Sequence, residues 1–385
     1  MTRVVRLALL ALTLAFIHGC VSTPQQQPPP VATPPKVLYE PVAWDKVDGW
    51  QQDQVQWAWD AFLKSCRALA SKPEWSGVCA AAVPSTNARQ FFETRFVPYR
   101  IVQSAGLDQV VDTGLITGYY EPLLRGSRKP SAAFAVPLFA PPDDLLTIDL
   151  AELFPELKGK RLRGRVQGRK VVPYYTRAEI AGKPSLQGKE LVWVDNAVDA
   201  FFLEVQGSGR VQFADGSVVR MAYADQNGQP YRSIGRYLVD QGEMTLDQAS
   251  AQSIRRWVDE HPERKQEVLN ANPSVVFFRE EKIENPAEGP KGALSVPLTG
   301  GRSLAVDPQF VPLGAPVFLA TTQPNSTEPL KRLVLAQDTG GAIRGVNRGD
   351  LFWGFGPAAG ESAGRMKQQG RMWLLWPKGL PLPPQ

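Results

Sequence analysis

The sequence predicts a mostly β fold with few helices. Gly and Pro are abundant, with 33 and 34 among 385 residues, whereas only 5 residues are Met. This composition is typical of many turns between short strands rather than of a helical bundle. The hydrophobic share of 43% indicates a globular chain, and its length is enough for two domains. After the N-terminus no apolar run approaches the roughly 18 residues that span a bilayer.

Residues 1–19 have the pattern of a signal peptide. Two early arginines precede the apolar run Leu7–Ile17, which is too short to span a membrane. The sequence Ile17-His18-Gly19-Cys20 resembles a bacterial lipobox, which predicts cleavage before Cys20 and attachment of lipid to it. Residues 20–40 are then this Cys and a Pro/Gln-rich tether. A plain secretory signal is the alternative.

The residue after Cys20 is Val21 rather than Asp. In Gram-negative lipoproteins this usually indicates the outer membrane. We therefore expect an outer-membrane lipoprotein that faces the periplasm, with the tether holding its folded part away from the membrane.

Two cysteines remain after Cys20, namely Cys66 and Cys79. In an exported protein an even pair predicts a disulfide. Closing a loop of about 14 residues contributes about 3 kcal/mol to stability in the chain-entropy model. Two buried thiols are the alternative.

The first half of the chain predicts two helices and two hairpins. Apolar residues at spacings of three and four predict an amphipathic helix over 55–69. A second short helix is expected over 88–96, with Asn87 as its cap. Hairpins are expected over 165–172, about Gln167-Gly168, and over 209–223, about Asp215-Gly216.

The second half predicts one further helix and several strands. A capping-box pattern at Thr245-Leu-Asp-Gln248 predicts a helix start there, with Ile254, Trp257 and Val258 turned inward. Short strands are expected over 293–298, 317–319, 333–336 and 372–376.

Few histidines are available for catalysis or metal binding. Once the signal peptide is removed, His261 is the one His of the chain, in a polar setting typical of the surface. A Ser-His-Asp mechanism and a His-based zinc site are therefore disfavoured, and we expect neither a metal nor a cofactor. The net charge of +5 falls to about +3 without residues 1–19, which is too weak for nucleic-acid binding.

Carboxylates are the remaining acid–base groups, and two of them stand out. An apolar strand runs into Asp338, and a second strand-like segment delivers Asp350 beside Leu351, Phe352 and Trp353. Partial desolvation there would raise the pKa of Asp350, as a general acid near neutral pH requires. Capping of a Gly-rich turn is the structural alternative for each Asp.

Two Asp-Thr-Gly triplets also suggest another enzyme class. They begin at Asp112 and Asp338, each after an apolar strand. Pepsin-like aspartic proteases carry two such triplets, whose aspartates share a proton. The triplet is short, and we keep this function as an alternative.

Longer motifs point to a specific family. In their order along the chain they resemble membrane-bound lytic murein transglycosylase A, from about residue 40 to residue 376. The motifs are Gly118-Tyr119-Tyr120-Glu121-Pro122, Val205-Gln206-Gly207-Ser208-Gly209, Asn227-Gly228-Gln229-Pro230-Tyr231-Arg232, Asn272-Pro273-Ser274-Val275-Val276-Phe277-Phe278, Val296-Pro297-Leu298-Thr299 and Ala363-Gly364-Arg365-Met366. The C-terminal part also resembles the three-aspartate (3D) module, with Asp307, Asp338 and Asp350 as its aspartates.

The resemblance implies a fold and an activity. Residues 41–120 and 284–385 would form a double-psi β-barrel, and residues 121–283 an inserted β domain that forms the other wall of a glycan groove. The substrate would be the glycan strands of peptidoglycan, cut at the β-1,4 bond between N-acetylmuramic acid and N-acetylglucosamine with formation of 1,6-anhydro ends. Asp350 corresponds to the catalytic acid and Asp338 to a supporting group. Cell-wall enzyme complexes are compatible partners.

The groove walls are expected in the first three motifs. Tyr119, Tyr120, Glu121 and Tyr231 offer aromatic faces and a carboxylate, while Gln206, Gly207, Ser208 and Gly209 offer polar groups and close backbone donors. Packing within hairpins and the barrel is the alternative for each of them.

A single carboxyl is enough for the implied reaction. Ordinary glycosidases need two carboxylates, because water or an enzyme nucleophile must be activated as well as the leaving group. When the sugar's own C6 hydroxyl attacks, proximity supplies much of the rate advantage. A water-using muramidase, and a non-catalytic lipoprotein that binds peptidoglycan, remain as alternatives.

Overall fold

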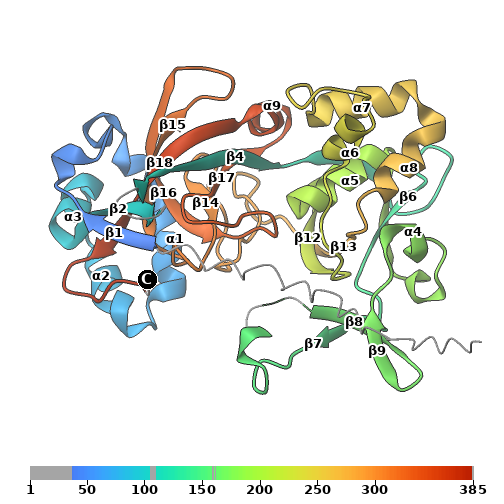
Figure 1. Cartoon of the computed structure of the whole chain (residues 1–385), viewed down its shortest axis with the longest axis horizontal. Coiled ribbons are helices and arrows are strands. Elements are labelled where there is room, and N and C mark those ends of the chain that lie inside the picture. The colour runs from blue at the N-terminus through green and yellow to red at the C-terminus, as the bar shows by residue number, and fades with distance from the viewer. Residues whose placement is uncertain (1–36, 105–109, 158–159, 161, 384–385) are drawn as a thin grey trace, which may run out of the picture. The chain divides into compact units, whose positions relative to one another are not determined.

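The computed structural model describes residues 37–104, 110–157, 160 and 162–383 (Figure 1). Its strands form a nine-stranded sheet, a six-stranded sheet and a three-stranded sheet. The predicted strand-rich fold, with a barrel and a second β domain, is confirmed. None of the helices in these ranges is long and apolar enough to cross a membrane.

Six strands of the large sheet close into a barrel. They follow one another in the order β18-β15-β16-β14-β17-β4, and β4 pairs again with β18. Two of these pairings, β14 with β16 and β4 with β17, are parallel, and the other four are antiparallel. The bounds are β4 (Thr113–Glu121), β14 (Ser303–Val306), β15 (Pro316–Thr322), β16 (Pro329–Asp338), β17 (Gly349–Phe355) and β18 (Lys367–Pro377).

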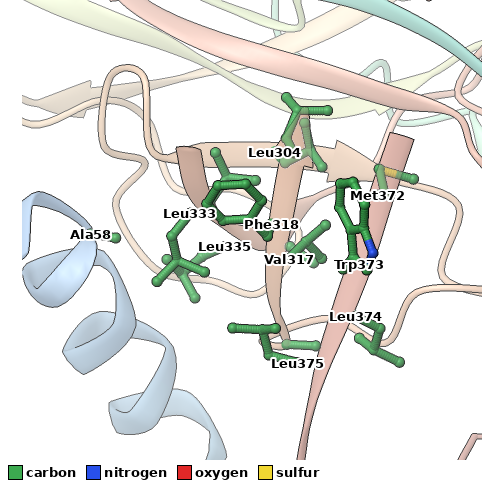
Figure 2. Packing of buried hydrophobic residues seen from close by; sticks show 14 of the residues in the cluster. Ala58, Leu304, Val317, Phe318, Leu333, Leu335, Met372, Trp373, Leu374 and Leu375 are labelled. Atoms are coloured by element: carbon green, nitrogen blue, oxygen red, sulfur yellow. The ribbon is translucent and has the colours of Figure 1, made fainter. Parts of the chain in front are cut away.

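Both ends of the described chain therefore contribute to one barrel, which has a continuous apolar core. Val317 of β15 and Leu374 of β18 are register partners and share one face of the sheet, whereas Leu335 of β16 lies on the other face, and all three are fully buried (Figure 2). Three further strands continue the sheet beyond β18, namely β1 (Val37–Pro41), β2 (Phe96–Ser104) and β3 (Val110–Val111).

Helices near the N-terminus cover this core. The helix predicted from position 55 consists of the 3-10 turn η3 (Val55–Ala58) and α1 (Trp59–Leu69). The predicted cap of α3 (Ala88–Arg95) is confirmed, because Asn87 Oδ1 accepts the N–H of Gln90 at 3.0 Å. Between them lies α2 (Pro73–Ala82), which the sequence did not reveal. Two further 3-10 turns are η1 (Trp44–Lys46) and η2 (Trp50–Gln52).

The second β domain lies between β4 and β14 in the sequence. Its six-stranded sheet has the order β13-β12-β11-β5-β10-β6. The bounds are β5 (Leu123–Ser127), β6 (Val136–Phe139), β10 (Glu190–Val194), β11 (Ser208–Gln212), β12 (Val218–Gln226) and β13 (Val276–Lys282). The smaller sheet contains β7 (Leu146–Ile148), β8 (Leu162–Gln167) and β9 (Lys170–Pro173).

Helices accompany the second domain, and one more joins the barrel. In the second domain α5 (Ala197–Gln206) packs against β11 and ends at Gly207, whose φ of 76° permits the left-handed turn into that strand. In the barrel α9 (Pro357–Arg365) lies on β4 and β17. The other elements are α4 (Arg177–Ile180), α6 (Ile234–Asp240), α7 (Ala251–Glu260), α8 (Lys265–Asn270), η4 (Pro155–Leu157), η5 (Pro184–Leu186) and η6 (Pro262–Arg264).

Three expected elements differ from the structure. The tether predicted to reach residue 40 is too long, because β1 begins at Val37 and pairs with β2. The helix expected from Thr245 starts instead at Ala251, where the side chain of Ser250 caps the N–H of Ser253. Residues 293–298 form no strand; a single bridge between Lys291 and Pro297 closes a turn there.

Candidate active site

The barrel brings Asp338 and Asp350 to one face of three neighbouring strands. Asp338 ends β16, Asp350 is the second residue of β17, and β14 lies between these strands. Ala305 of β14 is the register partner of both aspartates. Two strand spacings separate their backbones, so the Cα atoms are about 10 Å apart. The short strands predicted from the sequence therefore place both candidate acids in one site.

Asp350 is held by the parallel strand β4. Its register partner there is Thr117, whose hydroxyl donates a hydrogen bond of 2.6 Å to Asp350 Oδ1. Burial is the main cause that raises the pKa of this carboxyl to about 6, and the nearby charge of Asp338 adds to the rise. The Thr117 hydroxyl and the Arg348 guanidinium oppose it. Asp350 can therefore hold a proton in mildly acidic solution, as a general acid must.

Asp338 has a different set of partners. Its Oδ1 accepts the backbone N–H groups of Ala293 and Thr339, each at 2.9 Å. Its Oδ2 accepts the hydroxyl of Tyr119, also at 2.9 Å. Three donors therefore fix this carboxylate in place beside Asp350, which suits a supporting charge better than a group that transfers protons.

Tyr119 connects the two halves of the site. It lies two residues after Thr117 on β4, so both side chains are on one face of the strand. Its ring packs on Phe352 of β17 with a centroid separation of 5.2 Å. Burial, together with the charges of Asp338 and Asp350, raises the pKa of this phenol well above its usual value. Tyr119 is therefore a neutral hydrogen-bond donor at all working pH values.

Two cavities meet at these residues, and we call them lobe 1 and lobe 2. Lobe 1, of about 360 Å³, contains Asp350, Arg348 and Ala305 of the barrel and Tyr231 and Asn272 of the second domain. Lobe 2 has a volume of about 310 Å³. They share the wall residues Tyr119, Gln206, Gly207, Tyr223, Asp338 and Thr339.

Most of the expected groove residues line these lobes. Gln206 and Gly207 line both, Tyr231 lines lobe 1, and Tyr120 and Ser208 line lobe 2. Gln206 Oε1 also accepts the N–H of Tyr120 at 3.0 Å, which ties the second domain to β4. A Cβ on Gly360 of α9 would lie 2.8 Å from the Tyr120 ring, so glycine there lets the helix approach this tyrosine.

Two expected groove residues have other positions. Glu121 is 1% exposed and accepts hydrogen bonds from Arg210 at 2.8 Å and Arg220 at 2.5 Å. Its carboxylate therefore turns away from the groove and joins the end of β4 to β11 and β12. Gly209 lines neither lobe; a Cβ there would lie 2.4 Å from Leu203, so it serves packing between α5 and β11.

Two further residues of the site, Thr117 and Arg348, were not predicted from the sequence. Thr117 could have been found by the period of two that relates it to Tyr119. Arg348 lines lobe 1, and its guanidinium donates to the backbone carbonyls of Leu115 and Gly349. Burial lowers the pKa of this arginine from its usual value. No pattern in the sequence distinguishes it from the neighbouring arginine at 344.

The third aspartate of the C-terminal module lies outside the groove. Asp307 is 3% exposed, and its Oδ2 accepts the N–H of Gly345 at 2.9 Å while Oδ1 accepts that of Gln309 at 3.2 Å. The hydrogen bond from Gly345 therefore fixes the loop between Asp338 and Asp350 on the side away from the groove.

The cysteines lie away from both lobes. Cys66 of α1 and Cys79 of α2 form a disulfide, with their Cα atoms 5.2 Å apart. It joins two helices that cover the barrel core. Cys20, the expected lipidation site, lies outside the described residues.

Comparisons with known proteins identify the family of the chain. Residues 115–279 match the MltA specific insert domain and residues 302–376 match the 3D domain. The membrane-bound lytic murein transglycosylase A of Escherichia coli (strain K12) is 34% identical over 266 residues. That match covers 67% of this chain and 64% of the E. coli protein, so it spans a little under two thirds of that relative.

Solved structures share the fold over most of their length. The monoclinic crystal structure of MltA from Neisseria gonorrhoeae has a TM-score of 0.77 and 36% identity, and the match covers 90% of this chain and 94% of that one. The structure of E. coli MltA with bound chitohexaose has a TM-score of 0.58 and 26% identity, with 90% and 95% covered. With both domain types matched and 94% of a relative covered at this identity, the chain belongs to the family of membrane-bound lytic murein transglycosylase A.

Proposed function

We propose that the protein is a lytic transglycosylase of peptidoglycan. It would cleave the β-1,4 bond between N-acetylmuramic acid and N-acetylglucosamine and leave a 1,6-anhydro end. The observation that carries the proposal is Asp350, which lines the groove, accepts the Thr117 hydroxyl and has a pKa of about 6. The relatives' names supply the reaction class, and the E. coli structure with bound chitohexaose supports an extended sugar chain as the ligand of the groove.

Asp350 would act first as an acid and then as a base. Its proton passes to the glycosidic oxygen as the bond from that oxygen to C1 of the muramic acid residue breaks. The C6 hydroxyl of the same sugar attacks C1, and its proton passes to the Asp350 carboxylate. One bond forms for the one that breaks, and the acid returns to its starting state. The intramolecular hydroxyl is already close to C1, so no second catalytic carboxylate is required.

The surroundings of Asp338 favour this reaction over hydrolysis. A hydrolase needs a second carboxylate that can activate water or attack the sugar. Both oxygens of Asp338 already accept hydrogen bonds from three donors, two of which are backbone N–H groups that cannot turn away. Its proposed role is therefore to hold the loop and to raise the pKa of Asp350.

The arrangement of the Asp-Thr-Gly triplets disfavours an aspartic protease. Asp112 pairs with Arg371 at 2.9 Å and with Arg100 at 3.5 Å, and it lines neither lobe. Asp112 precedes Tyr119, whose hydroxyl bonds Asp338, by seven residues of extended chain. Their backbones are therefore about 20 Å apart. Two carboxyl groups so placed cannot share a proton.

We also propose that Cys20 carries a lipid that anchors the protein in the outer membrane. The relatives' names describe membrane-bound enzymes. The sequence around Cys20, with Val21 after it and a Pro/Gln-rich segment beyond, supports an anchor with a spacer.

Mass spectrometry of products released from purified sacculi tests the activity. The proposed reaction gives muramic acid ends that lack one water relative to hydrolytic ends. Hydrolytic ends would indicate a muramidase, released peptides a protease, and binding without release a non-catalytic protein. Any of these last three results would contradict the proposal.

A further inference from the structure

Lobe 2 extends the groove beyond the aspartates and has its own polar groups. It shares Tyr119, Gln206 and Asp338 with lobe 1, but Asp350 lines lobe 1 alone. A ligand held at Asp350 can therefore extend past Tyr119 into a space of about 310 Å³ where no bond is broken.

Ser208 supplies the first indication. The residue is 8% exposed and lines lobe 2, and its hydroxyl has no hydrogen-bond partner in the described protein. A buried hydroxyl without a partner costs about 1–3 kcal/mol. Such a group is expected where a ligand atom completes the hydrogen bond. Ser208 directly follows Gly207, whose left-handed turn sets the position of the serine at the start of β11.

Two cationic side chains supply the second indication. Arg279 of β13 lines lobe 2, and its guanidinium is fixed by Glu281 at 2.6 Å and by the carbonyl of Tyr223. Lys291 lines the same lobe, and among the described residues no carboxylate lies within ion-pair distance of its ammonium group. Arg279 is largely neutralised by its partner, and the Asp338 carboxylate in the shared wall already accepts hydrogen bonds from Tyr119, Ala293 and Thr339, so Lys291 is the cation of the lobe that is available to a ligand.

The turn that carries Lys291 is hydrogen-bonded to Asp338. Gly292 N–H donates to the carbonyl of Val296 at 3.0 Å, and Ala293 N–H donates to Asp338. Ser295 in the same turn has a φ of 63°, a left-handed conformation that is unfavourable for a residue other than glycine. Strained positions of this kind persist where the surrounding contacts fix them, and they cluster at ligand sites.

We propose that lobe 2 binds a carboxylate of the peptide that substitutes the muramic acid residues of the glycan. The Ser208 hydroxyl would donate one hydrogen bond to it, and Lys291 would supply the balancing charge. The inference rests on the proposed function, because it takes the ligand of the groove to be a peptidoglycan strand. It makes the groove selective for strands whose peptides carry free carboxylates over strands whose peptides carry neutral carboxamides.

Binding to two matched ligands tests this independently of catalysis. Soluble glycan strands with their peptides, and the same strands after conversion of the peptide carboxyl groups to neutral carboxamides, would be titrated into protein that carries Asp350→Asn. The quantity measured is the ratio of the two Kd values. Because the charge-assisted contact is lost, Ser208→Ala and Lys291→Met should each reduce the preference for strands with free peptide carboxylates about tenfold. Lys291→Arg should retain most of it, and Lys282→Met, an exposed lysine of β13 outside the lobe, should leave the ratio unchanged.

The outcomes are distinct. An unchanged ratio in both Ser208→Ala and Lys291→Met overturns the inference. Equal weakening of both ligands also overturns it, because the lobe would then bind the sugar chain itself. Loss of folding is not expected, since Ser208→Ala removes a hydroxyl that has no protein partner and should not lower the melting temperature. Failure of the proposed function would appear separately, as an absence of anhydro ends with the unsubstituted enzyme.

Discussion

Asp338 and Asp350 lie on either side of the same residue, Ala305, and yet have opposite surroundings. Asp338 accepts three hydrogen bonds, two of them from the backbone, whereas the one donor to the Asp350 carboxyl in the described part of the chain is the hydroxyl of Thr117. A barrel strand therefore separates a carboxylate that is fixed by its donors from a carboxyl that is free to exchange a proton.

The raised pKa of Asp350 should reduce stability at neutral pH. This carboxyl titrates near 3.8 when unperturbed and near 6 in the folded protein. Between these values the folded state binds more protons than the unfolded state, so the free energy of unfolding falls as pH rises from about 4 to about 6. Asp350→Asn should therefore increase the free energy of unfolding by about 3 kcal/mol at pH 7 and by little below pH 4.

Denaturant unfolding between pH 4 and pH 8 measures this effect. Asp259→Asn, at an exposed position of α7, is the matched control and should leave the pH dependence unchanged. A variant Asp350→Asn that is less stable than the unsubstituted protein at pH 7 would contradict the pKa assignment.

Thr117 should control the pH profile of the reaction. Its hydrogen bond lowers the pKa of Asp350, so Thr117→Val should raise that pKa and shift the alkaline limb of the rate profile to higher pH. The maximal rate should fall at the same time, because the carboxyl loses the group that orients it. Thr113→Val, on the same face of β4 four residues earlier, should change neither quantity. A lower rate with an unmoved alkaline limb would show that Thr117 has only a structural role.

The disulfide should stabilise the barrel without affecting the groove. The double variant Cys66→Ser/Cys79→Ser should lower the free energy of unfolding by about 3 kcal/mol, as expected for closure of a loop of this length. Activity below the unfolding transition should persist, since neither cysteine lines a lobe. Equal stability of the unsubstituted protein with and without reductant would count against a structural bond.

The anchor is tested by Cys20→Ala. Without the thiol no lipid can be attached, so the variant should be found in the soluble periplasmic fraction and should still digest added sacculi. Fractionation of the expressed protein followed by an activity assay measures both properties. A variant that still sediments with the outer membrane would show that Cys20 is not the point of attachment.

The sequence was most informative where a local pattern determines the element. The strand ending at Asp338 is an apolar run followed by two glycines, the segment carrying Asp350 is an apolar run between Gly349 and Gly354, and they occur as β16 and β17. The helix start expected at Thr245 was wrong because Ser250 and Ser253 form a second capping box five residues later, and that one is used. Two capping boxes close together offer alternative helix starts, and the packing of the helix determines which one is used.

Contacts between distant parts of the chain could not be read from the sequence. Thr117 meets Asp350 because β4 and β17 pair in parallel across 233 positions, and no local pattern reveals that register. Glu121 shares a motif with Tyr119 and Tyr120, which suggested a common role. Its two arginine partners lie on β11 and β12, and their position became apparent only in the folded domain.

The central claim is that Asp350 alone transfers protons, and the turnover of two variants on the same sacculi tests it most directly. Asp350→Asn keeps the shape of the side chain but cannot exchange the proton, so turnover should fall by about 10²–10⁴-fold while glycan binding, measured separately, persists. Asp338→Asn should cost less, because it changes only the position and pKa of its neighbour. Near-normal turnover by Asp350→Asn, together with an inactive Asp338→Asn, would contradict the account and assign the acid to Asp338.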